Sequence, residues 1–329
     1  MSILVKGELR LDWVPEASEQ GEFIRRDSQF RHWITADGAA GPSGVGGFKA
    51  EPERYHLYLS HACPWAHRTL IFHQLKKLQD LISISVVHPD MGPEGWKFDS
   101  SFPGATIDHL HGFEFMYQVY VQAQADYSGL VTVPVLYDKQ TQQIVNNESS
   151  EIIRMLNSAF NGYTDVTTDY YPQAQREAID AINEIIYHDI NNGVYRCGFA
   201  TSQAAYETAF DKLFAALDTV EERLSQQRYL IGATLTEADW RLFTTLVRFD
   251  PVYVGHFKCN LRRIRDYPNL SNYLRDLYQM PGIADTVHLD HIKRHYYVSH
   301  PSINPTGIIP KGPQLDYGLP HDRTRFGES

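Results

Sequence analysis

The order of strand and helix patterns that begins at residue 54 constrains the fold most. In R-Y-H-L-Y-L-S (54–60), residues 55, 57 and 59 fall on one side of an extended chain and residues 56, 58 and 60 on the other, which is typical of a strand. The run I-S-I-S-V-V (82–87) alternates in the same way. Between these runs we expect a helix from Pro64 onward, because apolar residues recur at helical spacing at positions 71, 75 and 78. Two strands joined by a helix through short links predict a right-handed βαβ unit with parallel strands.

After a long polar insertion at 88–129, the sequence returns to strand patterns. V-T-V-P-V-L-Y (131–137) and Q-Q-I-V-N-N (142–147) predict two strands, and apolar residues spaced through 152–160 predict a closing helix. This order is that of a thioredoxin-like domain, with one missing helix that the insertion could contain. Pro134 cannot donate to a strand ladder, so we expect it at a strand start next to the active site, as a cis-proline.

Beyond residue 160 the patterns are helical, and no strand pattern is convincing. The stretch T-E-A-D (236–239) opens one helix, with Thr236 as its cap and Asp239 reaching back as in a capping box. The tail from Pro301 onward is irregular in pattern. Other apolar periodicities predict helices over 179–190, 206–224 and 270–277.

The predicted fold class is therefore α/β plus all-α. An N-terminal thioredoxin-like domain at 51–160 is followed by an all-helical domain at 161–329 that ends in an irregular tail. Residues 1–50 are expected to be mostly irregular and to pack on the thioredoxin-like domain. A length of 329 residues agrees with about two domains.

Composition excludes several functional classes. A formal net charge of −10 favours neither nucleic acid nor an anionic membrane as a partner. No apolar run approaches the ~18 residues of a membrane span, and charges within the first dozen residues leave no secretory core. Three scattered cysteines are too few for a disulfide framework. We therefore expect a reduced, cytoplasmic protein.

Cys63 stands between the first predicted strand and the first predicted helix, with Pro64 in the favoured first helical position. The free N–H groups and the positive end of the helix dipole then favour the thiolate and lower the cysteine pKa below its usual ~8.5. Ala66 occupies the position of the second cysteine in a C-x-x-C pair. A resolving thiol must therefore come from solution, where glutathione is the abundant one in a reduced compartment.

Two interpretations in which Cys63 is not a nucleophile remain open. It could be a small buried apolar residue. It could also bind a metal together with His67, but two ligands do not make a zinc site, and we predict no metal. His291 and His295 have helical spacing and are expected on a solvated face.

Several longer motifs carry a family resemblance over nearly the whole chain. They are R-Y-H-L-Y-L-S-H-A-C-P-W-A-H-R (54–68), F-R-H-W-I-T-A-D-G (30–38), S-F-P-G-A-T (101–106), N-N-G-V-Y-R-C-G-F-A (191–200) and I-N-P-T-G-I-I-P (303–310). They resemble the xi class of glutathione transferases, the glutathionyl-hydroquinone reductases. The resemblance implies reduction of glutathionyl-hydroquinones with glutathione as co-substrate, no tightly bound cofactor, and a homodimer formed through the helical half.

The resemblance also implies roles for individual residues. Cys63 is the nucleophile that takes the glutathionyl group. Tyr195 is the proton donor and acceptor for the ring, while Tyr253 and Tyr296 lower the pKa of the thiol. The glutathione site maps to Trp96, Leu130, Val131, Thr132, Val133, Glu148 and Ser149.

Two other functions stay open at this point. A lone thiol could also serve an omega-like thiol transferase or dehydroascorbate reductase, or it could be idle in a binding protein on a transferase fold. Cys197 is expected to be a buried cysteine at a helix end, with any role in the pocket undetermined, and Cys259 a bystander. The residues do not specify the physiological hydroquinone, because a pocket roofed by aromatic rings accepts flat rings in general.

Overall fold

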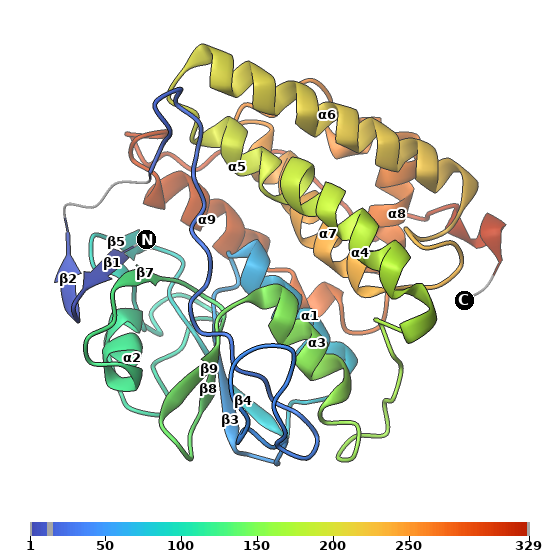
Figure 1. The fold of residues 1–329 in the computed structure, drawn as a ribbon. Coiled ribbons are helices and arrows are strands. Elements are labelled where there is room, and N and C mark those ends of the chain that lie inside the picture. The colour runs from blue at the N-terminus through green and yellow to red at the C-terminus, as the bar shows by residue number, and fades with distance from the viewer. Residues whose placement is uncertain (1, 12–15, 328–329) are drawn as a thin grey trace. The chain divides into compact units, whose positions relative to one another are not determined.

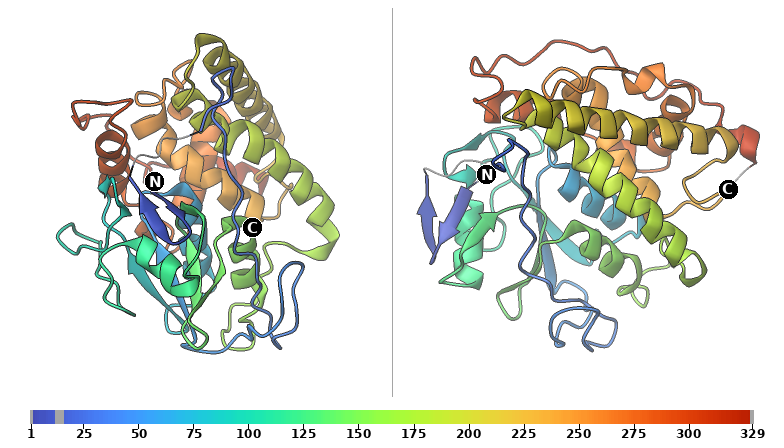
Figure 2. Two further views of the ribbon diagram at one scale, coloured as in Figure 1. Left: turned by 60° about the vertical axis from the view of Figure 1, so that its left-hand side comes forward. Right: turned by 45° about the horizontal axis from the view of Figure 1, so that its top comes forward.

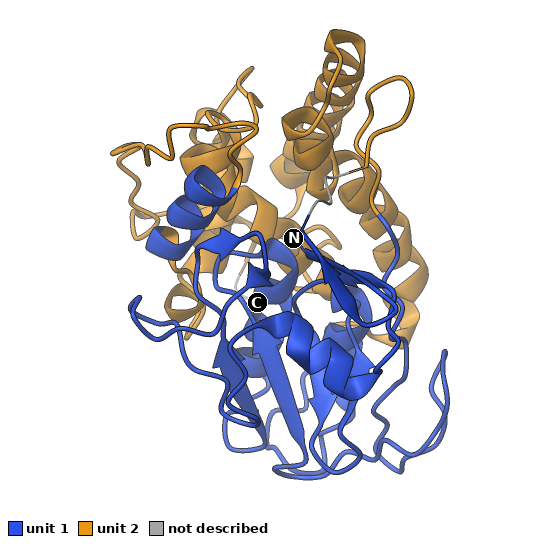
Figure 3. Ribbon diagram, turned by 90° about the vertical axis from the view of Figure 1, so that its left-hand side faces the viewer, with its two compact units in different colours: residues 1–14, 26–168, 290–299 blue, residues 15–25, 169–289, 300–329 orange. Residues whose placement is uncertain are grey.

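A computed structural model describes residues 2–11 and 16–327. It divides into two compact units (Figure 3). Unit 1 holds the described residues of 1–14, together with 26–168 and 290–299, and unit 2 holds the rest. The N-terminal segment was expected to pack on the thioredoxin-like domain, but residues 16–25 belong to unit 2. The helical residues 290–299, from the far end of the chain, belong to unit 1.

The core of unit 1 is a mixed sheet with the strand order β4-β3-β8-β9. Strands β3 and β4 are parallel, as the predicted βαβ unit requires, while β8 is antiparallel to β3 and to β9. All residues of β3 are buried, because this strand lies between two neighbours. The strands comprise Tyr55–Leu59 (β3), Ile82–Val86 (β4), Val135–Asp138 (β8) and Gln143–Asn146 (β9).

Three helices pack against this sheet. Helices α1 and α3 contact each other, and α1 contacts β3, whereas α2 contacts β9 from the other side (Figure 1). The helix α2 lies inside the long insertion, so the prediction that the insertion contains the missing thioredoxin-like helix is confirmed. The helices comprise Pro64–Leu75 (α1), Met116–Ala123 (α2) and Ser149–Ser158 (α3).

The strand predicted over 131–137 is in fact two strands. Its first part belongs to β7, which pairs with β1 in a second sheet of order β2-β1-β7, and its last part is β8. The peptide bond between Val133 and Pro134, in the gap between the two strands, is cis. The prediction that the N-terminus is irregular was wrong for β1 and β2. The bounds are Ser2–Val5 (β1), Glu8–Arg10 (β2), Gly129–Val131 (β7), Met91–Gly92 (β5) and Gly95–Trp96 (β6).

Unit 2 is helical, as predicted, and its strand-like pairing is limited among the described residues to isolated bridges. The long helix α6 runs beside α5 and also contacts α8 (Figure 2). Two π-helical segments, Ile186–Asn191 and Phe249–Tyr253, interrupt the regular helices. The α-helices comprise Arg176–Ile185 (α4), Gly193–Gly198 (α5), Gln203–Gln226 (α6), Glu237–Arg248 (α7) and Pro268–Tyr278 (α8).

Four short 3-10 turns lie among the described residues. They lie at Gln173–Gln175, Ile264–Asp266, Ala284–Thr286 and Arg323–Phe326. The last α-helix, Leu289–Ser299 (α9), packs within unit 1 over almost its whole length. In the described part of the chain, no helix combines the length and apolar character needed to cross a membrane.

The predicted capping box at the start of α7 is present. The backbone N–H of Thr236 donates to a carboxylate oxygen of Asp239 at 2.8 Å. The other oxygen of this fully buried carboxylate accepts from the Leu230 N–H and from the Tyr273 hydroxyl, each at 2.8 Å. The Asp239 side chain therefore connects the first turn of α7 to the preceding loop and to α8.

We expect Asp239→Ala to destabilise the fold by about 3 kcal/mol, because it leaves several buried donors without an acceptor. Urea denaturation measures this loss. Asp266→Ala is the matched control, because Asp266 closes a similar box on a largely exposed 3-10 turn. Asp266→Ala should lower the free energy of unfolding much less than Asp239→Ala does. An equal loss in the two variants would contradict the view that burial makes the Asp239 hydrogen bonds important.

Candidate active site

Cys63 is the N-cap residue of α1, and Pro64 is in its first turn, as the sequence predicts. The Cys63 carbonyl accepts the first helical hydrogen bond from the His67 N–H at 2.9 Å. No acidic residue occupies the first turn, so nothing there offsets the positive end of the helix dipole. The side chain is half-buried, whereas Cys197 and Cys259 are buried.

The thiol lies next to the peptide group that precedes the cis-proline. The Sγ atom of Cys63 is 3.5 Å from the carbonyl oxygen of Val133, within reach of an S–H···O hydrogen bond. This contact favours the protonated thiol, whereas the helix terminus favours the thiolate. Among the described residues, the backbone N–H of Val133 has no hydrogen-bond partner. An extended peptide could therefore pair with this residue as an added strand.

The three residues before Val133 have other backbone partners. Leu130 and Val131 pair with β1, and the Leu130 carbonyl accepts from a tyrosine hydroxyl. The backbone N–H and carbonyl of Thr132 both bond the hydroxyl of Tyr120, at 3.2 and 3.0 Å. These contacts hold the approach to Val133 in place, and they leave Val133 as the residue best able to bond a ligand.

Glu148 is the N-cap of α3 and Ser149 is its first residue. The backbone N–H of Ser149 has no acceptor among the described residues and can therefore hold an anion at this helix start. The carboxylate of Glu148 caps the helix by accepting from the Ser150 N–H at 3.0 Å. The hydroxyl of Ser149 accepts from Arg68 at 3.3 Å and keeps its own hydrogen to donate. Arg68 is 1% exposed and comes from α1, where it also lies over the ring of Trp65.

Arg68 was not among the predicted site residues, although it lies in the motif around Cys63. It adds a buried positive charge beside the start of α3. A buried arginine next to a helix N-terminus is suited to a carboxylate. The sequence contained one signal that could have identified Arg68: a charged residue at helical spacing from the apolar residues of α1.

Trp96 is buried at the end of a two-residue strand and stacks on His295 of α9, with ring centroids 4.7 Å apart. His291 and His295 were expected on a solvated face, and that expectation was wrong. Both are buried, and each bonds the carbonyl oxygen of a proline in the 89–103 loop. The next residue, Tyr296, is also buried.

The other two predicted tyrosines belong to unit 2, where they lie in one aromatic cluster. The rings of Tyr195 and Tyr253 are 6.3 Å apart, and both contact Phe257. Tyr195 lies in α5 directly after one π-helical segment, and Tyr253 ends the other. The guanidinium of Arg25 lies 4.9 Å from the centre of the Tyr195 ring.

Cys197 and Cys259 are neighbours within unit 2. Burial raises the pKa of the Cys259 thiol, and contact with Cys197 raises it further. Buried thiols of this kind are poor nucleophiles. In the described residues, no group of three or more histidine, cysteine and carboxylate side chains is arranged to hold a metal ion.

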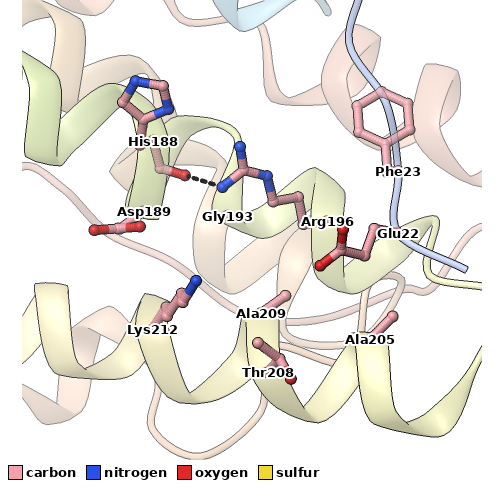
Figure 4. A pocket seen from close by; sticks show the side chains of 10 residues that line it. All are labelled: Glu22, Phe23, His188, Asp189, Gly193, Arg196, Ala205, Thr208, Ala209 and Lys212. Carbon is pink, nitrogen blue, oxygen red and sulfur yellow. Dashed lines mark hydrogen bonds between the residues drawn. The ribbon is translucent and has the colours of Figure 1, made fainter. Parts of the chain in front are cut away.

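A hollow of about 290 Å³ in unit 2 contains none of the predicted site residues. It lies beside α5 and α6, and charged side chains such as Asp189, Arg196 and Lys212 line it (Figure 4). Arg196 is held by the carbonyl oxygen of His188. Because neither Cys63 nor any other predicted site residue lines it, this hollow is not the candidate active site.

Comparison with known proteins identifies the family. Models of the N-terminal and C-terminal domains of glutathione S-transferase match residues 62–159 and 203–276. The glutathionyl-hydroquinone reductase YqjG of Escherichia coli is 58% identical over 99% of this chain and 100% of its own length. This chain belongs to the xi-class glutathione transferases.

Solved structures of xi-class proteins agree with the fold. The xi-class transferase of Natrialba magadii has a TM-score of 0.91 at 49% identity and covers 99% of this chain and 97% of its own. The glutathione-bound structure of YqjG has a TM-score of 0.88 at 60% identity and covers 89% of this chain and 96% of its own. The α/β plus all-helical class predicted for this xi-class chain is confirmed.

In this xi-class chain, we expect Cys63 to react with iodoacetamide well below pH 8 and the other two cysteines to stay protected in the native state. Intact-mass and peptide analysis should find one modified cysteine in native protein and three in urea. Modification of Cys197 or Cys259 at a comparable rate would contradict the burial of these thiols. A Cys63 reaction that rises only near pH 8.5 would mean that the Val133 carbonyl outweighs the helix terminus.

Proposed function

We propose that this protein is a glutathionyl-hydroquinone reductase. The observation that carries the proposal is one accessible thiol at a helix N-terminus, beside a Val133 N–H that no described residue occupies. The relatives support the substrate. YqjG and PcpF of Sphingobium chlorophenolicum, which is 51% identical over 95% of this chain and 96% of its own length, are both glutathionyl-hydroquinone reductases.

The geometry of unit 1 suits glutathione as the co-substrate. Val133 pairs with the cysteinyl residue of the peptide and brings its sulfur toward Cys63. The Ser149 hydroxyl and the start of α3 bind the γ-glutamyl carboxylate, with Arg68 adding charge. The carboxylate of Glu148 accepts the γ-glutamyl ammonium.

The reaction proceeds in two exchanges. The thiolate of Cys63 attacks the sulfur of the glutathionyl substituent, a sulfur–sulfur bond forms, and the bond between sulfur and the ring carbon breaks. A proton from Tyr195 to the ring system avoids a free carbanion, and hydroquinone leaves. The thiolate of a second glutathione then attacks the mixed disulfide, so that glutathione disulfide leaves and Cys63 is restored. The family resemblance assigns Tyr253 and Tyr296 the role of lowering the pKa of the thiol.

We expect Cys63→Ala to abolish turnover and Cys63→Ser to lower it by at least ~10³-fold, because the nucleophile is lost. Hydroquinone release from a glutathionyl-hydroquinone in the presence of glutathione measures the activity. When the resolving glutathione is withheld, the intact mass of native protein should rise by one glutathionyl group at Cys63. Turnover that survives in Cys63→Ala would overturn the proposal.

We expect Tyr195→Phe to slow the first exchange by about 100-fold, because the proton donor to the ring is lost. Attack of glutathione on a preformed Cys63 mixed disulfide should keep its rate. Stopped-flow measurement of each exchange separates the two steps. Tyr206→Phe is the control, since its hydroxyl bonds the Lys258 carbonyl at 2.7 Å. Equal slowing of both steps would assign Tyr195 a structural role.

A second function has support from other relatives. A protein of Schizosaccharomyces pombe named glutathione S-transferase omega-like 2 is 46% identical over 92% of this chain and 96% of its own length. The same thiol could therefore reduce mixed disulfides or dehydroascorbate. Rates measured side by side on these substrates and on glutathionyl-hydroquinones decide the order of preference.

We also propose a homodimer and a reducing, cytoplasmic environment. The dimer rests on the family resemblance. The environment follows from the reaction, which consumes reduced glutathione, and it suits a chain whose cysteines are all free thiols. No tightly bound cofactor is needed, because glutathione supplies the reducing electrons.

A further inference from the structure

Trp96 is held by a residue that lies almost two hundred positions away. The ring of His295 stacks on the indole with an interplanar angle of 20° and a centroid distance of 4.7 Å. Both side chains are buried, at 4% and 7% exposure. The Nδ1 atom of His295 lies 2.8 Å from the Pro89 carbonyl oxygen. Because a carbonyl only accepts, Nδ1 carries the proton, and this bond fixes the plane of the ring.

The local chain around Trp96 is too short to hold the indole by itself. Trp96 ends β6, which pairs only with the two residues of β5. Helix α9 braces this hairpin through Arg294, which makes two hydrogen bonds to Asp90 at 2.7 and 2.6 Å. The hydroxyl of Ser299 accepts from the Met91 N–H at 3.0 Å. The helix thus holds both the hairpin and the ring at its end.

The indole N–H of Trp96 has no acceptor among the described residues. The indole nitrogen is not among the enclosed side-chain atoms that have no partner, so water or a ligand oxygen can reach it. Here the ring is fixed by stacking rather than by its own hydrogen bond, so the donor is left for a bound molecule. An oxygen of a peptide carboxylate or carbonyl is the matching acceptor.

We propose that His295 is a positioning residue that orients Trp96 for glutathione. The inference rests on the proposed function, because it takes Trp96 to be part of the glutathione site. Without the stack, the indole gains rotational freedom that binding must then remove. His295 acts on glutathione affinity through Trp96 and touches neither the thiol nor the ring substrate in this role.

Three substitutions separate the two contacts of His295. His295→Phe keeps a ring for stacking and loses the bond to Pro89, whereas His295→Asn keeps a donor and loses the ring. His295→Ala loses both. Titration calorimetry with reduced glutathione should give a Kd raised about tenfold for the Ala and Asn variants and within about threefold of the parent for Phe. An unchanged Kd in the Ala variant overturns the inference.

His291→Ala is the matched control. His291 lies one turn away on the same helix and bonds the Pro103 carbonyl oxygen at 2.7 Å, but its ring contacts are with Phe102 and His61. The His291→Ala variant loses a comparable hydrogen bond between α9 and a proline carbonyl, and it keeps the stacking of His295 on Trp96. It should keep the parent Kd. If it weakens glutathione binding as much as His295→Ala, the stack has no special role and the inference falls.

A double variant tests whether His295 acts through Trp96. Trp96→Ala and the Trp96→Ala/His295→Ala double variant should bind glutathione equally weakly, since removing the indole removes the effect of the stack. Additive losses overturn the inference. If Trp96→Ala keeps the parent Kd, Trp96 is not in the glutathione site, and the inference falls while the assignment of Cys63 stands. If the parent itself binds no glutathione, the proposed function fails first.

Discussion

The structure of unit 1 is organised around one thiol held between a helix N-terminus and an incompletely paired peptide group. Cys63 begins α1, and its sulfur lies 3.5 Å from the Val133 carbonyl. The Val133 N–H is available because Val133 lies in the gap between β7 and β8, outside both sheets. If that segment continued as one strand, its backbone groups would be used up in a ladder. The break in the strand is thus a requirement of the site.

Charge is distributed to suit a ligand that carries carboxylates. The chain has a net charge of −10, yet the start of α3 has the buried cation of Arg68 beside it. Burial strengthens this interaction, since little water screens it. The same low dielectric makes the arginine costly unless an anion or strong acceptors are close. Its contacts with Ser149 and with the ring of Trp65 offset part of that cost.

Segments from both ends of the chain complete the two units. Strand β1 covers β7 and thereby orders the approach to Val133. Helix α9 holds the β5–β6 hairpin and stacks on Trp96. In unit 2, residues 16–25 bring Arg25 over the ring of Tyr195, and Asn192 accepts from this arginine at 2.6 Å. The domain cores therefore provide the sheet and the helices, and the terminal segments set the positions of individual aromatic side chains.

The sequence by itself determined the elements whose patterns are local. The alternation in β3 and β4, the position of Cys63 before Pro64, and the capping box of Thr236 and Asp239 involve neighbours in the chain, so each was readable. The family motifs added the candidate residues, whose roles remain proposals.

Only the tertiary structure decided the contacts between distant residues. Strand β1 is four residues long and pairs with a segment more than a hundred residues away, so its pattern is too short to read alone. The histidines of α9 have an amphipathic side chain, and their spacing fits a solvated face as well as a buried one. The carbonyl oxygens of Pro89 and Pro103, which satisfy their ring N–H groups, come from another part of the chain. Burial of a polar side chain depends on such partners, and the local sequence does not contain them.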